Sequence, residues 1–131
     1  MSDTERGWLT PSEMAERTGT TIDTLRYYEK ERLITGVARA PGGHRRYSEA
    51  DAGWIDVLRC LRLTGMSIQH MKHFAELGEQ GQHTEPERYR LLIDHRQRVL
   101  AQIAELRDAL VVLDNKTAIY RTALQQKGLI T

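Results

Sequence analysis

A single glycine, Gly19, separates two segments that each begin with a helix cap, and this feature constrains the fold most. The first segment opens with Thr10 as N-cap, Pro11 at the first helical position and Glu13 three residues after the cap, which is a capping box. Gly19 suits the left-handed residue that ends a helix, and Thr21 can cap a second helix almost at once. Two short helices joined so tightly over about residues 10–29 predict a helix-turn-helix, with a generic α-hairpin as the alternative.

The stretch after the second helix, about residues 33–47, holds strand-forming residues interrupted by Pro41-Gly42-Gly43. This pattern predicts two short strands joined by a loop, which is the wing of a winged helix-turn-helix. The same stretch contains a basic cluster with no acid inside it: Arg39, His44, Arg45 and Arg46. The cluster suits a phosphate backbone, but a solvated surface loop is the alternative.

The overall charge argues against a strongly basic nucleic-acid-binding surface. The chain has 131 residues with 19 Lys and Arg against 18 Asp and Glu, a net charge of +1. Domains that bind nucleic acid are often much more basic. Contact with DNA would therefore depend on local clusters such as the basic loop, within about one domain plus an extension.

Cysteine content and the N-terminal sequence indicate in which cell compartment the protein is found. Cys60 is the single cysteine, so an internal disulfide is excluded, and a lone thiol suits a reducing cytosol. No apolar run is long enough to span a membrane, and MSDTERGWLT lacks the apolar core of a signal peptide. We expect a cytoplasmic protein.

Two further helices complete a predicted domain over residues 8–77. Ser48 with Asp51 marks the start of the first, and Ser67, after the bend at Gly65, marks the start of the second. Residues 78–86 contain glycine and proline but no apolar side chain, so this segment is predicted to be a linker.

Residues 87–131 show a heptad pattern that predicts one long helix. The apolar seam that we expect at a dimer interface consists of Leu92, Val99, Ile103, Leu106, Leu110 and Leu113. A helix of this length cannot bury its stripe on so small a domain, so it needs a partner helix, most simply from a second copy of the chain. Folding back onto the wing domain is the alternative.

The segments LTPSEMAERTGTTIDTLRYYEKERLI and GGHRRYSEAD closely resemble the DNA-binding domain of MerR-family transcription regulators. The resemblance covers about residues 8–77, and the heptad helix is similar in kind to the family's antiparallel coiled-coil dimerisation helix. It implies a homodimer on pseudo-palindromic promoter DNA. In that family the dimer bends and untwists an overlong spacer so that RNA polymerase can engage both promoter elements.

The resemblance also implies which residues contact DNA. The helix Arg26-Tyr27-Tyr28 and the wing Arg45-Arg46-Tyr47 match family motifs, while His44 stands where the family often has tyrosine. Helical periodicity alone also makes Tyr28 a candidate for the core. The full set of DNA-binding candidates is Thr21, Thr24, Arg26, Tyr27, Tyr28, Arg39, Gly43, His44, Arg45, Arg46 and Tyr47.

The residues that are missing from the chain limit which kind of effector it could sense. Residues 78–131 contain no cysteine, so the soft-metal and iron–sulfur sites of other members are not expected, and no cofactor or metal is predicted. His70 and His73 alone make an incomplete metal site. RCLRLTGMSIQHMKHFAEL resembles the single-cysteine NmlR/AdhR subgroup, which implies that Cys60 senses a small electrophile or oxidant. A small buried core side chain is the alternative for Cys60.

These observations predict a mainly α-helical, winged helix-turn-helix regulator of transcription rather than an enzyme. The sequence contains no glycine-rich phosphate loop, no HExxH motif and no evident nucleophile–base pair, so no catalytic residue is assigned. The alternative function is a protein-interaction adaptor whose helix-turn-helix contacts RNA polymerase or another protein without sequence-specific DNA binding.

Overall fold

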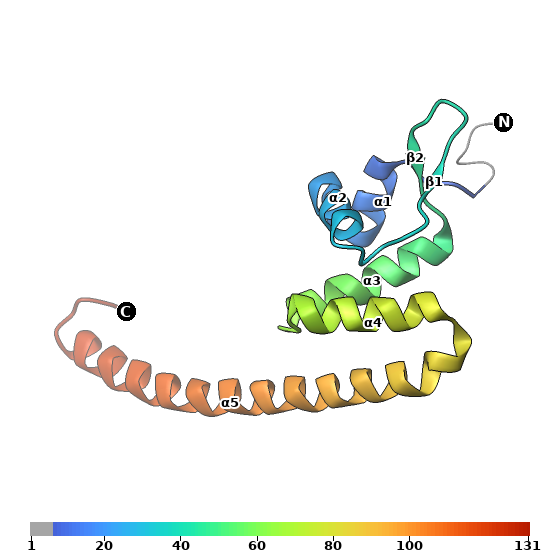
Figure 1. Ribbon diagram of the computed structural model, residues 1–131. Coiled ribbons are helices and arrows are strands. Elements are labelled where there is room, and N and C mark those ends of the chain that lie inside the picture. The colour runs from blue at the N-terminus through green and yellow to red at the C-terminus, as the bar shows by residue number, and fades with distance from the viewer. Residues whose placement is uncertain (1–6) are drawn as a thin grey trace. The chain divides into compact units, whose positions relative to one another are not determined.

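The computed structural model describes residues 7–131 and is mainly helical, with a small two-stranded wing (Figure 1). This confirms the predicted fold class. Residues 1–6, on which the expected lack of an export signal partly rests, lie outside the described residues. The elements in chain order are α1 (Pro11–Thr18), α2 (Ile22–Lys30), β1 (Ala38–Arg39), β2 (Arg45–Arg46), α3 (Glu49–Leu63), α4 (Ile68–Gln80), the 3-10 helix η2 (Gln82–Thr84) and α5 (Glu85–Gln126).

The first two helices begin and end where the local sequence indicates. The Thr10 side chain accepts a hydrogen bond from the Glu13 N–H, and the Glu13 carboxylate accepts one from the Thr10 N–H. Gly19 ends α1 with φ 66°, and Thr21 caps α2 by accepting a hydrogen bond from the Thr24 N–H. These caps satisfy backbone groups that a helix end would otherwise leave unpaired, so the turn between α1 and α2 is fixed locally.

The core of the first unit lies between the helix-turn-helix, the wing and helices α3 and α4. Trp54 of α3 stacks on Phe74 of α4 with ring centroids 5.2 Å apart, and its indole Nε1 donates to the Leu33 carbonyl over 2.8 Å. The largest fully buried side chains are Met14, Leu25, Tyr28, Leu33, Tyr47, Ile55, Leu58 and Met71. The wing and helices α1 and α2 therefore pack on one apolar core.

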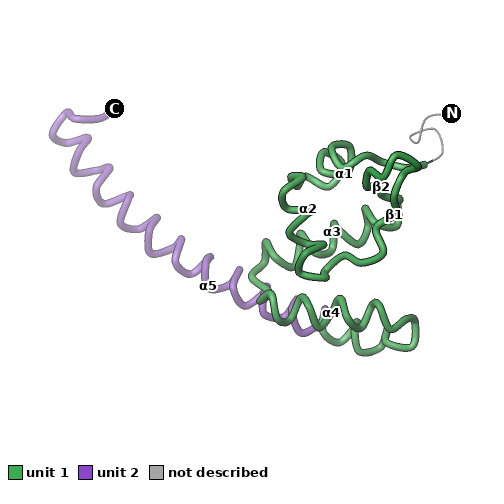
Figure 2. The backbone as a smooth tube through the Cα atoms, turned by 45° about the horizontal axis from the view of Figure 1, so that its top comes forward, with its two compact units in different colours: residues 1–91 green, residues 92–131 purple. Residues whose placement is uncertain are grey.

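The chain divides into two compact units, residues 1–91 and 92–131, and the boundary falls inside α5 (Figure 2). This differs from the linker expected over residues 78–86. Helix α4 continues to Gln80, and α5 begins at Glu85, because Pro86 is tolerated in a first helical turn. The buried hydroxyl of Thr84 donates to the Leu77 and Gly81 carbonyls, which satisfies the end of α4 without any apolar side chain.

Helix α5 has 42 residues, which corresponds to a length of about 63 Å at a rise of 1.5 Å per residue. From residue 101 onward, nearly every side chain of this helix is exposed in the single chain. Within the expected seam, Leu106, Leu110 and Leu113 are 66%, 54% and 58% exposed, while Leu92 and Val99 are partly covered. The dimer interface itself stays a prediction.

Candidate nucleic-acid interface

The wing is a short hairpin closed by a tight turn. Strands β1 and β2 pair antiparallel, with Ala38 opposite Arg46 and Arg39 opposite Arg45. Pro41 sits in the turn, where the Gly43 N–H donates to the Ala40 carbonyl over 2.8 Å. Gly43 has φ 87°, a conformation in which a side chain would be strained. The predicted glycine-bent loop is therefore present, with strands only two residues long.

The segment before α1 pairs with the backbone at the end of the wing. Leu9 and Tyr47 form an antiparallel bridge in which each N–H donates to the other's carbonyl over 2.8 Å. The guanidinium of Arg46 lies over the Trp8 ring, 4.2 Å from its centroid. Sequence reasoning missed the role of Trp8, because a contact between residues so far apart leaves no local signal.

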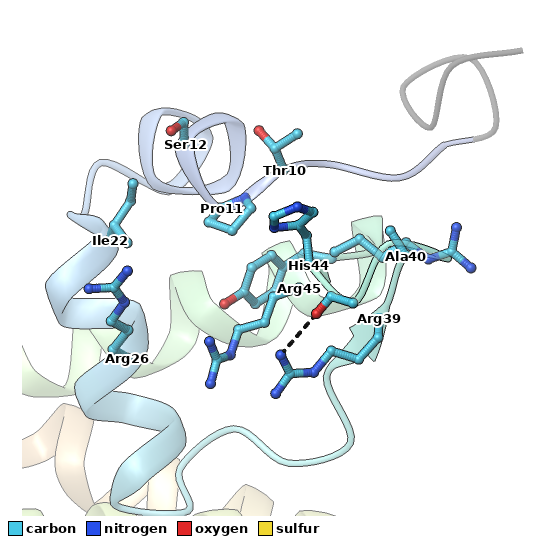
Figure 3. Close-up of a pocket in the computed structure, with 12 residues that line it drawn as sticks. Thr10, Pro11, Ser12, Ile22, Arg26, Arg39, Ala40, His44 and Arg45 are labelled. Carbon is cyan, nitrogen blue, oxygen red and sulfur yellow. Dashed lines mark hydrogen bonds between the residues drawn. The ribbon is translucent and has the colours of Figure 1, made fainter.

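A groove of about 560 Å³ lies between helices α1 and α2 and the wing (Figure 3). Its walls come from the start of α1, from the first half of α2 and from the wing: Thr10, Pro11, Ser12, Ile22, Arg26, Arg39, Ala40, Gly43, His44, Arg45, Arg46 and Tyr47. Four of these are arginines and none is an acid. The structure thus brings Arg26 of α2 together with the wing cluster, as expected, and adds the α1 start and Ile22, which we did not predict.

The four arginines are held to different degrees. Arg26 makes only a long, exposed contact of 3.8 Å to Asp23, and Arg39 donates to the Gly43 carbonyl over 3.2 Å. The Nε of Arg45 donates to Glu29 over 2.7 Å, in a pair that is mostly shielded from solvent. The side chain of Arg26 is therefore weakly held, whereas Arg45 is anchored to α2.

Tyr28 and Tyr47 do not belong to the exposed surface. Both side chains are only 1% exposed, so their rings are packed mainly in the core. Burial raises the pKa of the Tyr47 phenol above its usual value of 10.0, and the charge of Glu29 raises this pKa further. For Tyr28, the core interpretation of the helical pattern is confirmed. Contact of Tyr28 and Tyr47 with DNA stays a prediction, and Tyr47 lines the groove although its side chain is mostly covered.

The remaining candidates lie at the surface. Tyr27 is 38% exposed, and the Arg62 guanidinium lies 5.3 Å from the centroid of its ring. Thr21 and Thr24 sit at the N-terminus of α2, where the Thr21 hydroxyl donates to the Thr24 hydroxyl over 2.9 Å. His44 is exposed beside the wing turn. Of these residues His44 lines the groove, whereas Thr21 and Thr24 line a second pocket together with Arg59 and Arg62.

Cys60 lies on α3, and its side chain is exposed. The alternative interpretation of Cys60 as a small buried core residue is therefore wrong. Ile55, Leu58 and Leu61 provide the buried face of this helix instead. Solvent access is one of the two conditions for a reactive thiol, the other being nearby positive charge.

Within residues 7–131, no three metal-binding side chains lie close enough together to hold an ion. No helix in the same part of the chain combines the length and apolar character that a membrane span requires.

Comparison with known proteins gives concordant matches. The model of the MerR HTH family regulatory proteins matches residues 9–77, and a second model, MerR, DNA binding, matches residues 54–115. An uncharacterised HTH-type transcriptional regulator of Haemophilus influenzae is 40% identical over 114 residues, which are 87% of this chain and 84% of that protein. The regulator AdhR of Bacillus subtilis is 38% identical over 68% of this chain and 64% of its own length.

Solved structures agree with these sequence matches. The crystal structure of HiNmlR, described as a MerR family regulator lacking the sensor domain and bound to promoter DNA, has a TM-score of 0.81 and 40% identity. The match covers 88% of this chain and 92% of that chain. A MerR family regulator from Listeria monocytogenes has a TM-score of 0.80 at 34% identity, over 92% of this chain and 93% of that one.

Proposed function

Because this chain belongs to the MerR family of helix-turn-helix regulatory proteins, we propose that it is a homodimeric transcription regulator that binds a palindromic promoter element. In this proposal α2 enters the major groove, α1 crosses the backbone and the wing lies along the phosphates. The similar HiNmlR, which was solved bound to promoter DNA, supports this choice of partner.

The observation that carries the proposal is the groove lined by Arg26, Arg39, Arg45 and Arg46. A cationic groove without a carboxylate in its wall attracts a polyanion even though the whole chain has a net charge of only +1. Its walls combine a helix N-terminus with arginine side chains, and both are usual donors to phosphate.

The proposed homodimer accounts for the exposed apolar side chains of α5. Two copies joined through Ile103, Leu106, Leu110 and Leu113 would cover side chains that the single chain leaves in solvent. A two-fold dimer presents two copies of the groove, which matches a palindromic element.

In the proposed mechanism the dimer distorts the spacer DNA between promoter elements, so that RNA polymerase responds to DNA shape. Cys60 is the proposed point at which a small electrophile or oxidant changes this effect. The protein would act in the cytoplasm, where promoter DNA is found, and would have no catalytic function of its own.

The test is selection of bound duplexes from random-sequence DNA, followed by affinity measurements over a range of salt concentrations. The wild-type protein should select a palindrome. The double variant Arg45→Ala, Arg46→Ala should weaken binding to all sequences and reduce the slope of log K against log salt by about one unit per lost phosphate contact. Arg90→Ala with Arg98→Ala removes the same charge from α5 and should leave the slope near the wild-type value.

The outcomes separate the proposal from the adaptor alternative. A selected palindrome with a wing-dependent salt slope supports the regulator. If the protein binds no duplex even at low salt, the adaptor is supported and the DNA-binding proposal is wrong. An unchanged slope in the wing variant would show that the wing does not touch the backbone.

A further inference from the structure

The α2 helix and the wing are joined by one side-chain ion pair, and we infer that its acid, Glu29, is a positioning residue for DNA binding. In this inference Glu29 orients the Arg45 side chain and so presents its guanidinium to a phosphate. The inference rests on the proposed function, because it assigns a role in binding the same DNA. None of the sequence motifs points to Glu29 as more than a helix residue.

The geometry of the pair indicates a persistent contact. The Nε of Arg45 and a carboxylate oxygen of Glu29 lie 2.7 Å apart, and the two side chains are only 35% and 28% exposed. The exposed pair of Arg26 and Asp23 is longer, at 3.8 Å, with side chains 67% and 94% exposed. Partial shielding from water reduces screening, so the first pair should hold at salt concentrations that loosen the second.

The pair leaves Arg45 able to bind a phosphate at the same time. A guanidinium carries five N–H donors in a planar fork, and the bond to Glu29 uses Nε. The two terminal nitrogens can then form the bidentate contact that arginine makes with phosphate. Glu29 therefore orients the cation without having to be displaced by DNA, and Figure 3 shows Arg45 in the same groove as Arg26.

The backbone beside Arg45 is also fixed. Tyr47 is buried, lies close enough to Glu29 for the acid to raise the pKa of its phenol, and bonds through its backbone to Leu9. The wing strand is thus held to the core through Tyr47 and to α2 through Arg45. Loss of the Glu29 contact would free the Arg45 side chain while the strand itself stays in place.

The chain offers a matched control for Glu29. Glu31 is also 28% exposed, and it forms an ion pair of 2.8 Å with Lys72, at the C-terminal end of α2 and outside the groove. Glu29→Gln and Glu31→Gln each remove one negative charge and one ion pair of nearly equal length. Only the first of these changes acts on an arginine of the groove.

The experiment measures the affinity of full-length protein for the duplex that the wild type selects and for a scrambled duplex. We compare wild type, Glu29→Gln, Glu31→Gln, Arg45→Ala and the double variant Glu29→Gln, Arg45→Ala. Glu29→Gln should weaken binding to both duplexes about fivefold, because a phosphate contact carries little sequence information, whereas Glu31→Gln should leave both affinities within about twofold of wild type. In the Arg45→Ala background, Glu29→Gln should cause no further loss.

Three results would overturn the inference. The first is a Glu29→Gln variant that binds DNA as tightly as Glu31→Gln does. The second is a Glu29→Gln substitution that lowers the affinity for DNA equally in the presence and in the absence of Arg45. Should Glu29→Gln fail to fold, Arg45→Lys provides the third test. Lysine keeps the charge but lacks the planar fork that offers Nε to Glu29 and two terminal nitrogens to phosphate. Wild-type affinity of Arg45→Lys would refute positioning. A wild type that selects no duplex would refute the proposed function as well, so the two failures are distinguishable.

Discussion

Replacing Leu106 and Leu110 by alanine should dissociate the proposed dimer while preserving α5. These side chains are 66% and 54% exposed in the single chain, and complete burial of a leucine is worth about 1.5–3 kcal/mol. Covering the exposed part of each leucine then contributes about 0.8–2 kcal/mol, and a homodimer contains four of them. The total is about 4–7 kcal/mol, which corresponds to a dissociation constant higher by roughly a thousandfold or more. Alanine favours helix, so α5 itself should persist.

Sedimentation velocity across a concentration series measures this change, with circular dichroism to confirm helix content. The matched control is Val111→Ala with Val112→Ala. These side chains are 58% and 68% exposed but, at 3.6 residues per turn, point away from the seam. The reasoning is refuted if the leucine variant keeps the wild-type association constant, or if the valine variant weakens the dimer equally.

The remaining predictions concern reactivity, pH and packing. Formaldehyde or methylglyoxal should change promoter output in a reporter assay for wild type but not for Cys60→Ser, and an equal response of the variant would remove Cys60 as the sensor. Burial, and then the charge of Arg98, lowers the pKa of His95 from 6.5, so the folded state resists protonation and stability should fall as the pH drops below about 6.5. Thermal unfolding of His95→Gln should show a weaker acid dependence than wild type. Gly53→Ala in α3 meets open space and should gain up to about 1 kcal/mol of stability in urea unfolding, whereas in Gly78→Ala the new Cβ would lie 3.0 Å from Trp54 and should cancel that gain.

Local chemistry made the helix-turn-helix predictable. The capping box at Thr10 and the left-handed Gly19 act within a few residues, so the sequence contains all the groups involved. The basic loop was predictable for the same reason, since Pro41 and Gly43 determine their own turn.

Features that depend on burial or distant partners could not be predicted in the same way. Helical periodicity allowed Tyr28 to face either the core or DNA, and only the packing of α2 on the core removes its ring from the surface. Residues 78–86 are largely helical rather than an open linker. A segment without apolar side chains can still be ordered by a buried polar group, here the hydroxyl of Thr84. The pair of Glu29 and Arg45 joins residues 16 apart and has no local signature.

The bridge between Leu9 and Tyr47 has a consequence for how the protein folds. It closes a loop of backbone that contains α1, α2 and the whole wing hairpin, so a pair of backbone hydrogen bonds joins the segment before α1 to the end of the wing. The hairpin and each helix can form from neighbouring residues, but this closure must bring distant residues together and carries the larger entropic cost. The groove should therefore be completed late in folding, and amide hydrogen exchange should show Leu9 and Tyr47 opening together.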